Sequence, residues 1–216
     1  LDQYGVSDES VLYNQADLFF KVQNKYSINA TMMYALALNE SGLGLSQYAL
    51  EYHNLFGHAA IDENPNNANQ YSSLAECVKQ HAYNFLQQGY LNPNDSRYHG
   101  SWFGDKASGI NVNYASDPYW GEKAASFYYH LDEGSIDQEK NPIKTIQLSK
   151  DLKVYAPNKK DVLYTYKKGN IVSIHILKNE IGYYKISSEA PVKDNDLNVN
   201  SKYKNSYVYI KKSDFK

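Results

Sequence analysis

The sequence predicts an α+β protein with a mainly helical first domain and a small all-β second domain. Apolar residues follow a helical period up to about residue 142 and then alternate with polar ones, as in strands. Charge divides at the same point: residues 1–142 hold 7 basic and 17 acidic residues, and residues 143–216 hold 15 and 7. Because 216 residues exceed one typical domain, we predict domains over 1–136 and 143–216, joined by a polar linker over 137–142.

Four helices are expected in the first domain. A first helix over 8–25 would be capped by Asp8, and a second over 30–40 by Asn29. The capping box Ser73-x-x-Glu76 opens a third helix that ends at Gly89, and Asp117-Pro118 opens a fourth that ends near residue 134. Residues 53–71 are rich in Asn and Pro and predict a short strand or two with a loop, and residues 92–116 are irregular.

The second domain contains five segments of alternating apolar residues. Such short strands, separated by turns at Lys168-Gly169 and around Gly182, predict a small barrel. The segments span residues 152–155, 162–166, 171–177, 183–186 and 207–210.

Several classes of function lack their signals in this sequence. One cysteine, Cys77, gives neither an intrachain disulfide nor a zinc framework, and we interpret it as a buried thiol. The six histidines lack metal-ligand spacing and no glycine-rich phosphate loop occurs, so we predict no metal and no cofactor. Nucleic-acid motifs are missing, and no apolar run approaches the roughly 18 residues of a membrane span. Because the chain begins at Leu1 and not at Met, we expect a fragment with its targeting sequence upstream.

Glu40 is the first candidate catalytic residue. It shares a helical face with the apolar Met33, Leu36 and Ala37, and Gly42 then ends the helix. The negative end of the helix dipole and partial burial both disfavour an ionised carboxylate, so the pKa of Glu40 should be raised. A carboxylic acid that keeps its proton near neutral pH is what a glycosidase uses to protonate a leaving oxygen. The alternative is a glutamate that merely extends into water at a helix end.

Three motifs carry a family resemblance. The segments 35–46 (Ala-Leu-Ala-Leu-Asn-Glu-Ser-Gly-Leu-Gly-Leu-Ser), 54–57 (Asn-Leu-Phe-Gly) and 106–121 (Lys-Ala-Ser-Gly to Tyr-Trp-Gly) resemble, in order and spacing, the family 73 glycoside hydrolases. These are bacterial endo-β-N-acetylglucosaminidases that cut peptidoglycan. The resemblance covers residues 1 to about 134. It implies a lysozyme-like helical catalytic domain with a small β-lobe beside the cleft, and a secreted autolysin that acts on the β-1,4 bond between N-acetylglucosamine and N-acetylmuramic acid.

The resemblance also implies roles for single residues. Glu40 would be the general acid, and Asp62 the second carboxylate, with its neighbour Glu63 as the rival and a solvated loop acid as the alternative. A water-activating Asp62 would lie roughly 6.5 to 9.5 Å from Glu40, whereas a longer gap favours assistance by the substrate's acetamido group. Tyr114 is expected near the general acid, where it would bind that group or the reacting centre, or else pack in the core.

Five further residues are candidates for substrate binding. Phe56 and Trp120 could equally belong to the core, and Asn54 is expected to brace its turn; the neighbouring Asp117 is more simply a helix cap. The five candidates are Asn54, Phe56, Trp102, Tyr119 and Trp120.

Residues 143–216 resemble bacterial SH3-like wall-binding domains, through segments 163–174, 182–186 and 207–215. With its net positive charge this domain should meet an anionic surface, so the expected partners are glycan strands and the anionic cell wall, bound by a monomer. Two alternatives stay open. One is a muramidase or lytic transglycosylase of lysozyme-like fold, and the other is a wall-binding module whose catalytic domain has decayed.

Overall fold

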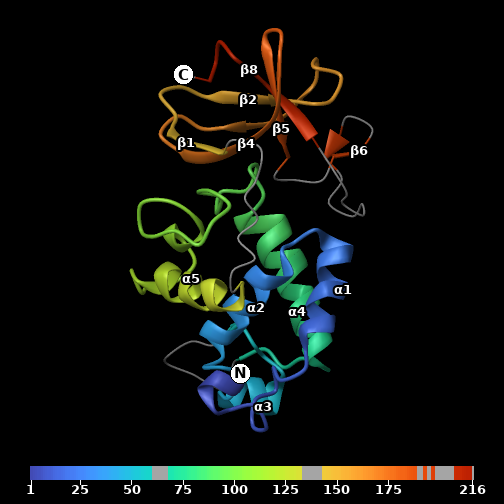
Figure 1. Ribbon diagram of the computed structural model, residues 1–216, viewed down its shortest axis with the longest axis vertical. Coiled ribbons are helices and arrows are strands. Elements are labelled where there is room, and N and C mark those ends of the chain that lie inside the picture. Colours follow the sequence, from blue (N-terminus) through green and yellow to red (C-terminus); the bar gives the residue numbers. More distant parts are fainter. Residues whose placement is uncertain (60–67, 133–142, 189–191, 194–195, 198–206, 216) are drawn as a thin grey trace.

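The structure, a computed structural model, describes residues 1–59, 68–132, 143–188, 192–193, 196–197 and 207–215 (Figure 1). Its described helices all precede residue 133 and its described strands all follow residue 142, so the predicted α+β class is confirmed. Buried apolar side chains gather in two clusters, one among the helices and one on the sheet.

The described helical part contains helices that differ in length and type. Helix α4 continues directly into the π-helical stretch η3, and η1 and η4 are single 3₁₀ turns. The elements are η1 (Asp2–Tyr4), α1 (Ala16–Tyr26), α2 (Ala30–Glu40), α3 (Gln47–Tyr52), α4 (Leu74–Gln80), η3 (His81–Tyr90), η4 (Ile110–Val112) and α5 (Trp120–Leu131).

Helix α2 lies at the centre of this part and packs against both α1 and α5 (Figure 1). As predicted, Asn29 caps it, since the Asn29 side chain accepts a hydrogen bond of 2.8 Å from the Met32 amide. Met33, Leu36 and Ala37 are fully buried. A helix that is apolar on nearly every side is stable only when other elements surround it, so α2 forms the core and carries Glu40 at its end.

The start of the first helix differs from the prediction. Helix α1 begins at Ala16, and residues 7–14 form turns, so Asp8 caps no helix. The apolar residues before α1 serve a tertiary contact instead: Leu12 is fully buried, and the Ser10 hydroxyl donates to the Leu43 carbonyl at 2.6 Å. The short helix α3 was not predicted. Ser46 caps it by accepting from the Ala49 amide at 3.2 Å.

The later helices follow the prediction with shifted ends. Ser73 caps α4 through the Glu76 amide at 3.2 Å, as expected, but Gly89 lies inside η3, which runs to Tyr90. A Cβ on Gly89 would come within 2.3 Å of the Arg97 guanidinium, so packing explains this glycine better than helix termination. Helix α5 starts at Trp120, two residues after Pro118. In residues 53–59 and 68–71 the structure has no strand, and the rest of the predicted β-lobe, residues 60–67, lies outside the described residues.

The second part is a six-stranded antiparallel sheet in the order β1-β4-β5-β8-β2-β3, with β6 and β7 paired separately. All five predicted strands are present, and β1 is an addition. Their bounds are β1 (Ile143–Gln147), β2 (Leu152–Tyr155), β3 (Val162–Tyr166), β4 (Ile171–Glu180), β5 (Tyr183–Ser187), β6 (Val192–Lys193), β7 (Asp196–Leu197) and β8 (Tyr207–Lys211).

The sheet is not closed into the predicted barrel, because its edge strands β1 and β3 do not pair with each other. Strand β4 pairs with β1 through residues 171–175 and with β5 through residues 176–180, and its register shifts between Ile176 and Lys178. Such an irregularity bends a strand. Alternating residues define the two faces of each strand, but closure also needs a matching stagger of all strands, which alternation does not encode.

One residue of the helical part belongs to the buried cluster of the sheet. Tyr98 is 5% exposed, and its ring centroid lies 5.9 Å from that of Tyr166 in β3. Nearby, the Asn94 side-chain amide donates to the Leu163 carbonyl at 3.5 Å. The loop that follows η3 therefore contacts the sheet (Figure 1).

None of the described helices has both the length and the apolar character needed to cross a bilayer.

Candidate active site

Glu40 is the last residue of α2 and precedes a sharp turn. The fully buried Ser41 donates from its hydroxyl to the Ala37 carbonyl and accepts from the Gly44 amide at 2.8 Å. Residues 42, 43 and 44 have φ values of 55°, 64° and 80°, a left-handed run that glycine adopts without strain. Ser41, Gly42 and Gly44 thus end the helix directly after Glu40. They fix the backbone position from which the Glu40 side chain extends.

Glu40 has a polar partner from the other end of the helical part. The Trp120 Nε1–H donates a hydrogen bond to Oε1 of Glu40. Burial raises the pKa of Glu40, and this hydrogen bond partly opposes the shift because it favours the charged carboxylate. The net direction is upward, which is the direction expected from the sequence, with burial as the leading cause.

Tyr114 lies beside the same pair. Its ring stacks on that of Trp120, with centroids 4.5 Å apart and planes inclined by 29°. Burial raises the pKa of Tyr114 well above its ordinary value, and the nearby charge of Glu40 adds to the shift. The phenol therefore stays neutral and can donate a hydrogen bond. Glu40, Tyr114 and Trp120 form one cluster, which we call the acid cluster.

Two side chains fix the segment that supplies Tyr114 and Trp120. The Lys106 ammonium donates to the carbonyls of Asn111 and Ala115, both at 2.6 Å. The buried Asn111 amide donates to the Asp117 carbonyl at 3.0 Å. These bonds close the loop onto itself before α5 begins. No role for Lys106 or Asn111 was predictable from the sequence, since both side chains bind backbone carbonyls, which leave no pattern of residue types.

Asn54 and Phe56 lie inside the protein. Asn54 is 1% exposed, and its side chain donates to the carbonyls of His58 and Asn69 and accepts from the His58 amide. This is the bracing role that was expected of it. Phe56 is 4% exposed and stacks on His81 with centroids 3.7 Å apart. Both side chains stabilise the turn from inside the protein. Neither is exposed enough to contact a sugar directly.

Behind this turn, two buried histidines form a pair. His58 Nε2 and His81 Nδ1 lie 3.0 Å apart, and His58 Nδ1 lies 2.6 Å from the Tyr71 hydroxyl. Burial lowers the pKa of His58 to about 4 and that of His81 well below its usual range, so both rings are neutral at neutral pH. No spacing in the sequence had indicated this pair.

Trp102 and Tyr119 are placed differently from each other. Tyr119 is 64% exposed, next to Trp120 in the chain, and is free to contact a ligand. Trp102 is partly buried and lines a hollow of about 390 Å³ together with Phe103 and Tyr128. Asp117 accepts from the Tyr119 amide at 2.9 Å and pairs with Lys123, as a residue capping the turn before α5 would.

The predicted second carboxylate, Asp62, and its rival Glu63 lie outside the described residues. Their distance from Glu40 stays a prediction. Cys77 is buried as expected, and burial raises the pKa of its thiol to about 12. Among the described residues, no group of His, Cys, Asp and Glu side chains is arranged to hold a metal ion.

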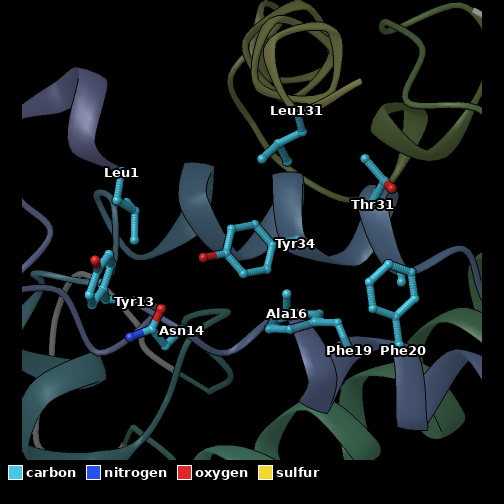
Figure 2. Close-up of a pocket in the computed structure, with 10 residues that line it drawn as sticks. Leu1, Tyr13, Asn14, Ala16, Phe19, Phe20, Thr31, Tyr34 and Leu131 are labelled. Carbon is cyan, nitrogen blue, oxygen red and sulfur yellow. The ribbon is translucent and has the colours of Figure 1, made fainter. Parts of the chain in front are cut away.

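One apolar hollow of the helical part lies away from Glu40. It has a volume of about 320 Å³ and lies over the first half of α2, where Thr31 and Tyr34 face Phe20 of α1 and Leu131 of α5 (Figure 2). Its lining contains no carboxylate, and the Tyr34 hydroxyl is engaged with the Leu12 carbonyl at 2.7 Å. Without an acid or base it cannot perform proton transfer to a sugar, so the acid cluster is the better candidate.

Comparison with known proteins gives matches to the helical part. A family model described as "Mannosyl-glycoprotein endo-beta-N-acetylglucosaminidase" matches residues 16–133. Two curated proteins of Streptococcus pneumoniae, from the serotype 4 strain TIGR4 and from strain R6, carry the name endo-beta-N-acetylglucosaminidase, and each is 34% identical over 127 residues. The match covers 58% of this chain but only 18% and 17% of those relatives, so the chain spans less than a fifth of their length.

Two solved structures are similar at lower identity. Autolysin E of S. aureus is 23% identical with a TM-score of 0.45, over 59% of this chain and 64% of that one. The catalytic domain of the autolysin Auto from Listeria monocytogenes is 20% identical with a TM-score of 0.36, over 60% of this chain and 81% of that one.

The family match covers more than half of the chain and includes all three residues of the acid cluster. It agrees with the resemblance to family 73 drawn from the three motifs. The chain belongs to the glucosaminidase family and is therefore a glycoside hydrolase by family.

Proposed function

We propose that the protein hydrolyses the glycan strands of bacterial peptidoglycan at the β-1,4 bond between N-acetylglucosamine and N-acetylmuramic acid, with Glu40 as the general acid. The observation that carries the proposal is Glu40 itself. It is a carboxyl group at the end of the core helix, its pKa is raised by burial, and it lies within the matched family range. The names of the pneumococcal relatives and of the two autolysins support the same substrate class.

The hydrogen bond from Trp120 suggests how the acid works. It engages Oε1 of Glu40, so the transferable proton would reside on Oε2. As the glycosidic C–O bond breaks, this proton passes to the leaving oxygen and Glu40 becomes a carboxylate. The Trp120 N–H then stabilises the new charge, because a hydrogen bond to an ionised acceptor is stronger than one to a neutral acid.

The roles proposed for the second carboxylate, for Tyr114 and for the sugar-contacting rings rest on the family resemblance. Asp62 would activate water on the far face of the sugar, with Glu63 or the substrate's acetamido group as the alternative. The neutral hydroxyl of Tyr114 would donate a hydrogen bond to the acetamido group or to the reacting centre. Tyr119 and Trp102 are better placed to contact sugars than Trp120, which is 4% exposed and bonded to Glu40.

The domain division is part of the proposal. Residues 1–136 would form the catalytic domain, 137–142 a linker, and 143–216 an SH3-like domain that binds the wall. Separate buried clusters and opposite net charges support it. The protein would then act outside the cell, as a secreted monomer at the cell wall.

Product analysis tests the bond that is cut. Peptidoglycan digested by the protein is reduced with borohydride and analysed by mass spectrometry. Reduced N-acetylglucosamine ends are expected. Reduced muramic acid ends would instead identify a muramidase, anhydro ends a lytic transglycosylase, and unchanged peptidoglycan a wall-binding module without activity.

Glu40→Gln tests the general acid. The amide keeps the shape and can still accept from Trp120, but it has no proton to transfer, so activity should fall by at least about 10²- to 10⁴-fold. Near-normal turnover of this variant would refute the assignment.

Asp62→Asn tests the second carboxylate, with Glu63→Gln as the neighbouring control. A water-activating Asp62 predicts a similarly severe loss, whereas a solvated loop acid predicts less than about a threefold change, under about 1 kcal/mol of barrier. If only Glu63→Gln causes a severe loss of activity, Glu63 and not Asp62 is the second carboxylate.

A further inference from the structure

One face of the sheet carries tyrosines and lysines on adjacent strands. Tyr209 of β8 is the cross-strand partner of Tyr155 in β2 and of Lys185 in β5, and Lys211 of β8 is the partner of Tyr183 in β5. Cross-strand partners point to the same face, and so do residues two apart along a strand. These five side chains therefore share one face of β2, β8 and β5.

The other face of the same strands belongs to the buried apolar cluster of the sheet. Val154, Ile186, Val208 and Ile210 occupy the alternate positions and are fully buried, in the cluster that also includes Tyr98 of the helical part. The first face is thus turned away from the contact with the helices. We call it the tyrosine–lysine face; it consists of Tyr155, Tyr183, Tyr207 and Tyr209, with Lys159, Lys185 and Lys211.

The lysines of this face lie over rings. The ammonium of Lys185 is 3.6 Å from the ring centroid of Tyr207, and that of Lys159 is 4.3 Å from that of Tyr209. Lys211 lies 5.1 Å from the centroid of Tyr155. A cation–π contact orients an ammonium but leaves its full positive charge. The lysines are therefore held in fixed positions above the sheet.

Few acids compensate this charge. Glu180 pairs with Lys159 at 2.7 Å. The charge of Glu180 also acts on Lys185, and that of Asp214 on Lys211, but within the described ranges neither of these lysines has a carboxylate at ion-pair distance. All 15 basic residues of 143–216 are lysines, since the single arginine of the chain is Arg97. A lysine ammonium is a compact point charge that commonly binds phosphate. The face therefore offers several such charges to a polyanion.

We propose that the tyrosine–lysine face binds a phosphodiester-linked polyol or sugar polymer of the cell wall. The ammonium groups would contact the phosphates. The partly exposed rings of Tyr183 and Tyr207, apolar with a polar tip, would pack against the polyol or sugar between them, whereas Tyr155 and Tyr209, 8% and 7% exposed, form the base beneath the lysines. The proposal rests on the proposed function in one respect, namely that the protein works in the wall. The acidic residues 1–142, with 17 acids against 7 bases, would be repelled by the same polymer, so that the helical part stays available for glycan.

Sedimentation of the full-length chain with purified Gram-positive cell walls tests this at about 0.15 M salt. Lys185→Gln combined with Lys211→Gln should weaken wall binding by about 10- to 30-fold, since a lysine near an anionic surface contributes a factor of about five. The matched control is Lys144→Gln with Lys212→Gln. It also removes two charges and two cation–π contacts, both to Tyr184, whose side chain lies on the core side of the sheet. An equal loss in both double variants would show that net charge alone binds the wall and would overturn the proposal.

Two further measurements distinguish the occupants. Walls from which hydrofluoric acid has removed phosphodiester polymers should lose the binding; if they retain it, the glycan or peptide is the partner. Glu180→Gln should strengthen binding, because it removes the acid paired with Lys159.

If the face instead binds the acidic part of a second copy, the chain will dimerise at low salt and the lysine double variant will not. The Lys185→Gln/Lys211→Gln variant should cleave short soluble glycan as fast as the wild type. If the wild type itself does not cleave this glycan, the proposed function is refuted while the binding result still stands.

Discussion

At the scale of single residues, the contact between Trp120 and Glu40 controls the protonation of the acid. The indole N–H favours the carboxylate, and burial favours the protonated form more strongly. A general acid acts only while protonated, so the proposed role of Glu40 predicts that activity declines as the pH rises through its raised pKa. On this proposal the pair would set the alkaline limb of the pH–activity profile.

Trp120→Phe should move that limb to higher pH while lowering the maximal rate. Loss of the hydrogen bond destabilises the carboxylate, so the pKa of Glu40 should rise further. The rate falls because the carboxylate formed on proton transfer has lost a donor. The measurement is kcat/KM on soluble glycan against pH. Trp102→Phe, which removes the other tryptophan, is the control and should leave the limb in place; a limb that moves to lower pH in Trp120→Phe would contradict the role.

At the scale of elements, the start of α5 depends on a close approach of two backbones. A Cβ on Gly121 would lie 1.8 Å from the carbonyl oxygen of Gly104. Gly121 therefore allows the loop that carries Trp102 and Phe103 to lie directly against α5, beside Trp120.

Gly121→Ala should destabilise the protein by about 1–3 kcal/mol, through overpacking against a backbone that cannot rotate away. In a helix without this contact, the same change would raise the free energy of unfolding by about 1 kcal/mol. The sign of the change therefore shows whether the loop packs against Gly121. Urea unfolding measures it. Ser126→Ala, on the exposed face of the same helix, reports the helix propensity alone, and a stabilised Gly121→Ala variant would show that the loop is not held there.

The sequence predicted those elements whose signals are local. Asn29 and Ser73 cap their helices through amides three residues away, and the five alternating segments became strands. Strand β1 was missed because its pattern is mostly exposed, as befits an edge strand. The first helix was predicted too early because Leu12 fits a helical stripe, whereas its burial comes from packing near Gly44, far along the chain.

The candidate site was predictable in part for the same reason. Glu40 followed from its place at the end of an apolar helix and from its motif. Its hydrogen bond to Trp120 joins residues 80 positions apart, and no periodicity or cap encodes such a pair. The sequence left Trp120 open between a sugar wall and the core. Trp120 is 4% exposed, and this burial follows from tertiary packing that composition does not determine.

At the scale of the whole molecule, Tyr98 connects the helical part to the buried cluster of the sheet. It is contributed by the helical part, is 5% exposed, and packs with the sheet near Tyr166. Asp95 and Arg97 hold its loop through paired hydrogen bonds of 2.8 and 3.0 Å, and the Arg97 guanidinium lies over Tyr90, whose ring is 5.1 Å from that of Tyr114. A continuous set of contacts therefore leads from the sheet to the acid cluster. Deletion of residues 143–216 would expose Tyr98, so substitution is the cleaner test of how the parts depend on each other.

Tyr98→Ala should separate the unfolding of the two parts. Removing a buried aromatic ring costs about 3–5 kcal/mol, and here the loss falls on the contact between helices and sheet. Both tryptophans, Trp102 and Trp120, belong to the helical part, so tryptophan fluorescence follows that part alone while far-ultraviolet circular dichroism follows both. The two thermal transitions should coincide in the wild type and diverge in Tyr98→Ala. Tyr129→Ala removes an equal side chain that is 69% exposed and should leave them coincident. If the transitions already differ in the wild type and Tyr98→Ala changes neither, then Tyr98 does not couple the sheet to the helices.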